Sequence, residues 1–96
     1  MTKATEHEDQ VLALRREGTS FVKIAADLKC DSARAAVSAY RRALKRRPKA
    51  EQKDIRKREG VRFDAMEKAV RADNDLAPED AAKRLAKIER LRAAFA

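Results

Sequence analysis

The 96-residue sequence has few of the residues that build catalytic or metal sites. It contains one cysteine (Cys30), one histidine (His7), two glycines, two prolines and no tryptophan. A single cysteine excludes an internal disulfide and a zinc site built on several thiolates. One histidine and two isolated glycines leave no nucleophile–base constellation and no glycine-rich phosphate loop. We therefore expect a protein that is not an enzyme and that holds neither a cofactor nor a metal.

Long apolar stretches are also missing. No apolar run exceeds four residues, whereas a membrane-spanning helix needs about 20 and a signal peptide needs an apolar core of about 7–15. The sequence therefore predicts neither kind of segment. We expect no membrane partner and a cytoplasmic, nucleoid-associated location.

The residues that are present favour helices. Alanine, arginine, lysine, glutamate and leucine dominate the sequence, and all five are good helix formers. Apolar residues recur at helical spacing in five stretches, residues 5–17, 21–28, 32–47, 62–72 and 78–95. The fold class expected is all-α, with an N-terminal three-helix helix-turn-helix domain followed by two C-terminal helices.

Local signals set the expected ends of the first three helices. Thr5 and Glu8 match a capping box, which predicts that the first helix begins at Thr5. Gly18 is a natural stop, because glycine readily takes the left-handed conformation that ends a helix. Thr19 and Ser20 offer an N-cap for the second helix, and Asp31 or Ser32 offers one for the third. Only about three residues are expected between the second and third helices.

The second half of the chain carries fewer such signals. Pro48 disfavours helical geometry at the preceding residue and predicts a break there. Residues 49–59 are almost wholly charged and read equally well as a helix extension or as a linker. Gly60 marks a boundary, and a fourth helix is expected from about Arg62. Pro78 is expected at the first position of the fifth helix.

The basic charge is confined to one segment. The chain has a net charge of +8 and an isoelectric point near 10.1. Residues 32–58 hold eleven Lys/Arg and two acids, whereas residues 1–31 carry −1 and residues 59–96 carry no net charge. A concentrated basic segment indicates a polyanionic partner, with nucleic acid favoured over a membrane.

The expected helix over residues 32–47 has one apolar side and one cationic side. At about 100° per residue, the apolar side holds Ala33, Ala36, Val37, Tyr40 and Leu44. The other side has small residues near its N-terminus and cations near its C-terminus, which suits a helix that reads the major groove of DNA.

Roles on this helix follow from the chemistry of the side chains. Arg34 and Arg42 are candidates for bidentate bonds to guanine, and Ser38 for a bond to a base or phosphate. The remaining cations are better placed for phosphates. The full candidate DNA-binding set is Ser32, Arg34, Ala35, Ser38, Arg41, Arg42, Lys45, Arg46, Arg47 and Lys49.

A family resemblance supports this interpretation over residues 8–47. The pattern E-G-x-S-x-x-x-I-A-A-x-L, from Glu17 to Leu28, precedes a turn and a helix with Val37 and Arg41-Arg42. It resembles the helix-turn-helix of bacterial regulators, most nearly GcrA-type cell-cycle regulators, and also sigma-factor region 4 and resolvase-like domains. The resemblance implies that Ala25 is the small residue where two helices cross. Two differences are that Lys29 stands where the turn usually has glycine and that the turn is slightly long.

The domain map expected from these patterns has three parts. Residues 1–48 form a helix-turn-helix DNA-binding domain, residues 49–60 a basic connector, and residues 61–96 a helical region that mediates homodimerisation or higher oligomerisation. For this last region, folding back on the three-helix core is the open alternative. The function expected is a sequence-specific, double-stranded-DNA-binding transcriptional regulator of bacterial or phage origin. Two alternatives stay open. One is a phage DNA-packaging component like a small terminase subunit, and the other is a protein-interaction module that docks on RNA polymerase.

Overall fold

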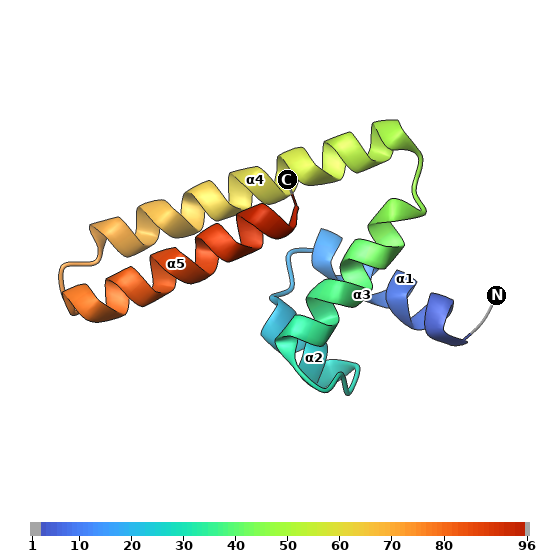
Figure 1. The fold of residues 1–96 in the computed structure, drawn as a ribbon, viewed down its shortest axis with the longest axis horizontal. Coiled ribbons are helices and arrows are strands. Elements are labelled where there is room, and N and C mark those ends of the chain that lie inside the picture. The colour runs from blue at the N-terminus through green and yellow to red at the C-terminus, as the bar shows by residue number, and fades with distance from the viewer. Residues whose placement is uncertain (1–2, 96) are drawn as a thin grey trace. The chain divides into compact units, whose positions relative to one another are not determined.

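The computed structural model describes residues 3–95, which form five helices and contain no strand (Figure 1). The all-α class expected from the composition is therefore confirmed for these residues. The helices are α1 (Lys3–Arg16), α2 (Phe21–Asp27), α3 (Ala33–Lys45), α4 (Lys49–Ala72) and α5 (Pro78–Ala94). None of the helices within the described range is long and apolar enough to cross a membrane.

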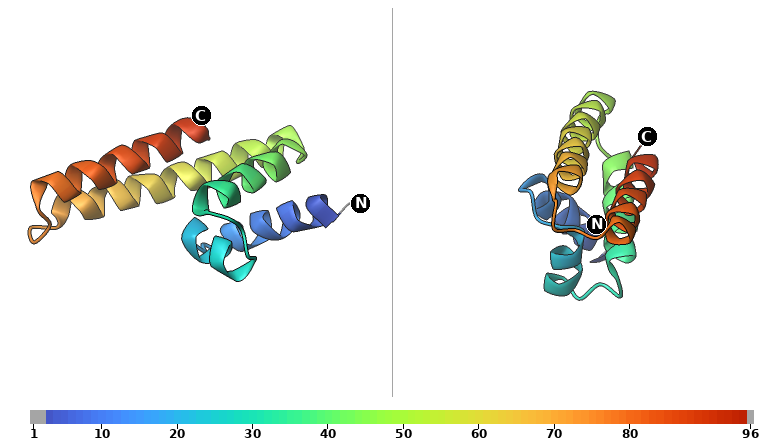
Figure 2. Two further views of the ribbon diagram at one scale, coloured as in Figure 1. Left: turned by 60° about the horizontal axis from the view of Figure 1, so that its bottom comes forward. Right: turned by 90° about the vertical axis from the view of Figure 1, so that its left-hand side faces the viewer.

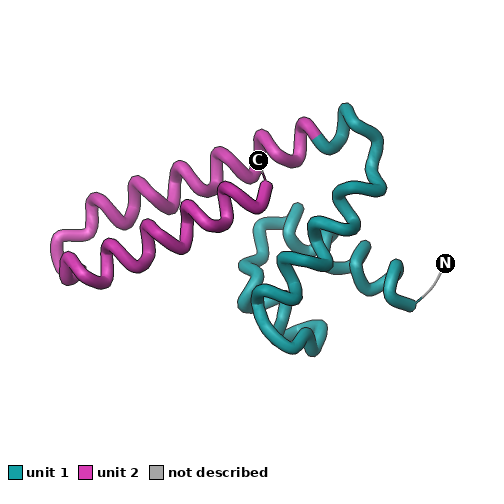
Figure 3. The backbone as a smooth tube through the Cα atoms, viewed as in Figure 1, with its two compact units in different colours: residues 1–52 teal, residues 53–96 magenta. Residues whose placement is uncertain are grey.

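The chain divides into two compact units, and the division falls within α4. Figure 3 shows the N-terminal unit, residues 1–52, and the C-terminal unit, residues 53–96. The boundary lies close to the end of the expected domain over residues 1–48. The charged segment 49–60 is not a separate linker, because it forms the first half of α4.

The N-terminal unit uses the end signals that the sequence predicts, with one exception. Gly18 has a φ of 99°, and the N–H groups of Gly18 and Thr19 bond the carbonyls of Arg15 and Leu14. This pair of bonds is the Schellman arrangement, which satisfies carbonyls left over at the end of α1. The start of α1 is the exception. The helix begins at Lys3, so Thr5 lies inside it and the predicted capping box is wrong.

The connection between α2 and α3 runs over residues 28–32 and is longer than the three residues expected. Lys29 takes a left-handed φ of 55°, and the N–H of Cys30 bonds the carbonyl of Ala25. Lys29 therefore occupies the position where a helix end favours glycine. Ser32 caps α3, since its hydroxyl accepts a hydrogen bond from the N–H of Ala35 at 3.1 Å.

The core of the N-terminal unit forms where α3 packs on both α1 and α2. Small residues on α3 permit close packing, because alanine occupies three of its five buried positions. Phe21 of α2 meets Tyr40 of α3 edge to face, with ring centroids 5.5 Å apart. The buried apolar residues of the unit are Val11, Leu12, Phe21, Ile24, Ala25, Ala36, Ala39, Tyr40, Ala43 and Leu44.

Pro48 ends the α3 segment as expected, and α4 then begins at Lys49 with the carbonyl of Pro48 accepting from the N–H of Gln52 at 2.9 Å. The boundary expected at Gly60 is wrong, because α4 continues without a break to Ala72. A glycine inside a helix lowers its stability by only about 1 kcal/mol, which is too little to interrupt the 24-residue α4.

The C-terminal unit is a pair of antiparallel helices. Residues of α4 and the whole of α5 run side by side in every view (Figure 1 and Figure 2). Long side chains join them. Phe63 and Phe95 stack with ring centroids 6.0 Å apart, and Arg92 reaches Asp64 at 2.7 Å and Glu67 at 3.0 Å. Pro78 occupies the first turn of α5 as predicted.

Candidate nucleic-acid interface

Helix α3 presents an outward face whose side chains make no polar contact with other elements among the described residues of the N-terminal unit. Arg34, Ser38, Arg41 and Lys45 recur at i, i+4, i+7 and i+11 and therefore share one side of the helix. We name these four residues the outer ridge. The three cations are exposed and Ser38 is half-buried. Within residues 3–95, no acidic side chain pairs with any of the three.

The buried face of α3 is rotated from the one that the sequence predicts. Ala36, Tyr40 and Leu44 are buried as expected, but Ala39 and Ala43 complete the face. The predicted members Ala33 and Val37 are only half-buried. This rotation moves the centre of the outward face onto Ser38 and Lys45. It also moves Arg42 and Arg46 from the outward face to the flank that faces α1.

Arg42 and Arg46 are held on α1 by acidic side chains. The Nε of Arg42 donates a short hydrogen bond to Oε2 of Glu8, and Nη1 of Arg46 donates to Oε1 of the same carboxylate at 2.5 Å. The second amino group of Arg46 reaches Asp9 at 3.0 Å. We name Glu8, Asp9, Arg42 and Arg46 the α1–α3 clamp. Base reading by Arg42 stays a prediction, and in this clamp the Nε of Arg42 is already bonded to Glu8.

The clamp fixes the charge of its members. Hydrogen bonds from Arg42 and then Arg46 hold the pKa of Glu8 below its ordinary value, against the opposing effect of burial. The same carboxylate, followed by Asp9, raises the pKa of Arg46. Glu8 is therefore ionised at neutral pH, and its charge offsets part of the positive charge of the two arginines.

The next two candidates lie beyond the end of α3. Arg47 donates to Oε1 of Glu51 from Nε at 3.1 Å and from Nη2 at 3.0 Å, and Arg16 of α1 reaches the same oxygen at 2.8 Å. Arg47 first and Arg16 second lower the pKa of Glu51. Lys49 is exposed and makes no polar side-chain contact within residues 3–95. Arg47 is therefore partly neutralised, whereas Lys49 is not.

The two small candidates have structural roles at the start of α3. Ser32 is exposed and its hydroxyl is used as the N-cap. Ala35 is half-buried beside the ridge and donates its N–H to that cap. The structure thus separates the ten candidates into the outer ridge, the paired arginines, the cap and the exposed Lys49.

The acidic partners of these arginines were not identified from the sequence. Glu8 was assigned to a capping box, and its contact with Arg42 joins residues 34 positions apart. A second contact that the sequence did not reveal joins Cys30 to His7, with Sγ and Nε2 3.6 Å apart. It ties the α2–α3 turn to α1, and both residues are half-buried.

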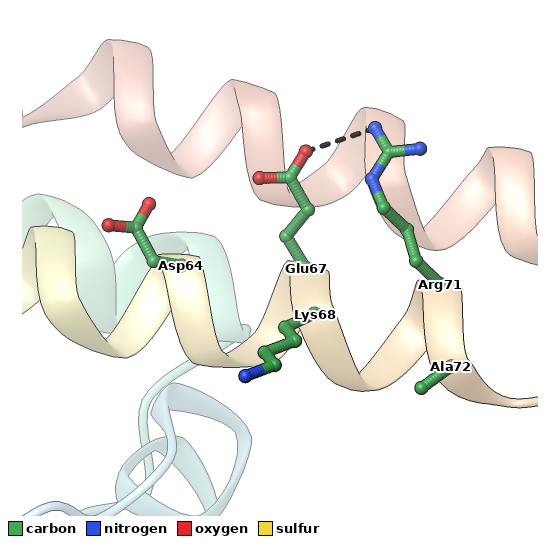
Figure 4. A pocket seen from close by; sticks show the side chains of 5 residues that line it. All are labelled: Asp64, Glu67, Lys68, Arg71 and Ala72. Atoms are coloured by element: carbon green, nitrogen blue, oxygen red, sulfur yellow. Dashed lines mark hydrogen bonds and ion pairs between the residues drawn. The ribbon is translucent and has the colours of Figure 1, made fainter.

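Other surfaces of the structure give less support for a binding or metal site. Figure 4 shows a shallow depression along α4 lined by Asp64, Glu67, Lys68, Arg71 and Ala72. Two of its acidic lining residues are already paired, since Glu67 contacts Arg71 at 3.1 Å and Asp64 contacts Arg92 at 2.7 Å. In the part of the chain that the structure describes, no three His, Cys, Asp or Glu side chains gather as metal ligands would.

No protein-family model, curated protein or solved structure matches this chain. The outer ridge must therefore be interpreted from its own geometry and charge.

Proposed function

We propose that this protein binds double-stranded DNA through the outer ridge of α3 and acts as a transcriptional regulator of the bacterial or phage type. The observation that carries the proposal is that some cations of α3 have acidic partners and others have none. Arg34, Arg41 and Lys45 are exposed with no acidic partner within residues 3–95. By contrast, Arg42 of α3 and Arg46 at its C-cap are both paired with Glu8. A helix with three uncompensated cations on one side complements a phosphate backbone.

The arrangement also supports reading of the major groove, with α2 and α3 acting as a helix-turn-helix. The N-terminal half of a recognition helix meets the base edges, and Arg34 and Ser38 lie in that half of the ridge. Arginine bonds guanine through two parallel hydrogen bonds, and a serine hydroxyl bonds any base edge or a phosphate. Arg41 and Lys45, nearer the C-terminal end, would hold the backbone. Binding to the nucleoid follows from the same contacts.

Two adjacent arginines allow a matched test. Arg41→Ala and Arg42→Ala remove the same charge from the same helix, but only Arg41 belongs to the outer ridge. Duplex binding should be followed by fluorescence anisotropy between about 50 and 200 mM salt. We expect Arg41→Ala to weaken binding about tenfold, as for a loss of 1.4 kcal/mol, and to reduce the salt slope by about 0.9.

Arg42→Ala should lower the stability of the fold more than it lowers the affinity of folded protein for the duplex. Equal losses of affinity in the two variants would mean that net charge, and not the ridge, governs binding. Selection of bound sequences from a random duplex pool then tests sequence specificity, because an enriched site is expected only if Arg34 and Ser38 read bases.

The predicted oligomerisation through residues 61–96 remains part of this proposal, because two copies would engage two half-sites. Light scattering should be measured at tens of micromolar, because modest self-association is populated at this concentration. The expected mass is twice the 10.8 kDa chain mass. A ring of many subunits would favour the DNA-packaging alternative. Absence of duplex binding at low salt would favour the module that docks on RNA polymerase.

A further inference from the structure

The C-terminal unit carries its own group of uncompensated cations at the beginning of its part of α4. Lys53, Arg56 and Lys57 are all exposed, and they recur at i, i+3 and i+4, so they share one side of the helix. Within residues 3–95 none of the three makes a hydrogen bond or an ion pair through its side chain. Gly60, seven residues after Lys53, continues this side and adds no side chain. We name Lys53, Arg56 and Lys57 the α4 patch.

The acid nearest to the α4 patch is already neutralised. Asp54 contacts Arg58 at 3.2 Å, which leaves the three patch residues as an excess of positive charge. Glu59, the next acid along the helix, is buried and contacts Arg62 at 2.5 Å. Both nearby carboxylates therefore belong to pairs that lie outside the patch.

Helix α5 carries a second group of exposed cations, which serves for comparison. Lys83, Lys87 and Arg90 also share one side of their helix and are exposed. Glu79 and Asp80 lie one turn before Lys83 alone, at the i,i+4 and i,i+3 spacings at which acids offset cations on a helix. The α5 residues have the same number and kind of cations as the α4 patch, but they lie within residues 59–96, which carry no net charge.

The chemistry of the α4 patch favours a phosphodiester backbone over a lipid surface. A helix that lies in a membrane surface needs large apolar residues beside its cations. Beside the patch lie Gly60 and one large exposed apolar residue, Val61, which follows Lys57 by four residues. A single valine does not supply the apolar face that such a helix needs. A duplex backbone requires only exposed cations at intervals along a helix.

We propose that Lys53, Arg56 and Lys57 form a second contact surface for the phosphate backbone of double-stranded DNA, separate from the outer ridge of α3. This inference rests on the duplex-binding function proposed above. It makes the C-terminal unit a direct contributor to affinity in addition to its predicted part in oligomerisation. The contact is independent of base sequence, since lysine and arginine bound to phosphates position a protein on the duplex without reading it.

The α4 patch and the α5 surface supply a matched pair of variants. K53A/R56A/K57A and K83A/K87A/R90A each remove two lysines and one arginine from exposed positions of the same unit, and alanine preserves helix propensity. Circular dichroism checks that both variants keep their helix content. Binding to a duplex of roughly two helical turns should be measured by anisotropy across about 50–200 mM salt.

The α4 variant is expected to lose about 2.7 from the slope of log K against log salt, as three phosphate contacts imply. The α5 variant should lose well under half of that. At about 100 mM salt the affinity of the α4 variant should be at least tenfold below that of the α5 variant. The relative loss should be equal for a selected and a random duplex, because phosphate contacts carry no sequence information.

Equal slopes for the two variants would overturn this inference while leaving the proposed function intact, provided that Arg41→Ala still weakens binding. Absence of duplex binding by the unmodified protein would overturn both. Vesicles with anionic headgroups serve as a further probe. Stronger binding to vesicles than to duplex, lost in the α4 variant alone, would assign the patch to lipid phosphates and refute the contact with DNA.

Discussion

Neutralising Glu8 should destabilise the N-terminal unit without changing the outer ridge. Glu8→Gln keeps the size of the side chain but removes the charge that holds Arg42 and Arg46. A hydrogen bond to a charged group contributes about 1.5–3 kcal/mol when it is buried, whereas an exposed ion pair contributes about 0.2–1 kcal/mol. The carboxylate of Glu8 is 10% exposed, but Arg42 and Arg46 are 59% and 39% exposed. Solvent screening therefore reduces the expected loss to about 1–2 kcal/mol.

Tyrosine fluorescence reports the unfolding of the N-terminal unit alone. Tyr40 is the only tyrosine, there is no tryptophan, and Tyr40 is fully buried in the core of the N-terminal unit. Its fluorescence during urea unfolding should give a lower midpoint for Glu8→Gln at an unchanged m value. Glu6→Gln is the matched control, because Glu6 lies on the same helix, is exposed and has no ion-pair partner within residues 3–95.

The pH dependence of stability tests independently whether the charge of Glu8 stabilises the N-terminal unit. The pKa of Glu8 is lower in the folded protein than its ordinary value, so the ionised form is stabilised by folding. Its contribution is present above the unfolded pKa of about 4.3 and is lost as the pH falls through the lower folded value. The difference in stability between the unmodified protein and Glu8→Gln should therefore shrink between about pH 5 and pH 2. A difference that stays constant across this range would refute an electrostatic origin.

Further predictions concern backbone conformation. Gly60→Ala should stabilise α4 by about 0.5–1 kcal/mol, since glycine costs this much inside a helix and an added Cβ meets no atom within 4 Å. Gly18→Ala should destabilise α1 by about 1–2 kcal/mol, because its φ of 99° is strained for alanine. Thermal unfolding followed by circular dichroism checks the opposite signs of this pair. Lys29→Gly should raise the free energy of unfolding by about 0.5–1 kcal/mol, because its φ of 55° suits glycine, and the urea midpoint reported by Tyr40 fluorescence should rise accordingly. A loss of stability there would contradict the assignment of a left-handed helix end.

The parts of the fold that could be predicted from the sequence depend on interactions within one turn. Gly18, Ser20 and Ser32 each bond a backbone group three residues away, so their effects are visible in a short stretch of sequence. Gly60 has no such partner. Glycine lowers helix stability only modestly. The boundary predicted at Gly60 is therefore wrong, because the helix formers on both sides keep α4 continuous.

The orientation of α3 could not be predicted for a different reason. Five alanines and Ser38 are small enough to fit either side of the helix, so periodicity alone permits two buried faces that differ by a fraction of a turn. The contact between Glu8 and Arg42 selects one of them, and it joins residues 34 positions apart. The sequence therefore predicts which helix carries the candidate site, whereas the pairing of its arginines is visible only in the tertiary structure.

The α1–α3 clamp also has a consequence for how this chain could change over time. Because Arg42 and Arg46 fix the rotation of α3 on its neighbours, the four outer-ridge positions contribute little to folding and can be substituted with little loss of stability. A combinatorial library at these positions would then sample new binding preferences on a constant scaffold. The clamp would allow the binding surface to be changed by substitution while the fold keeps its stability.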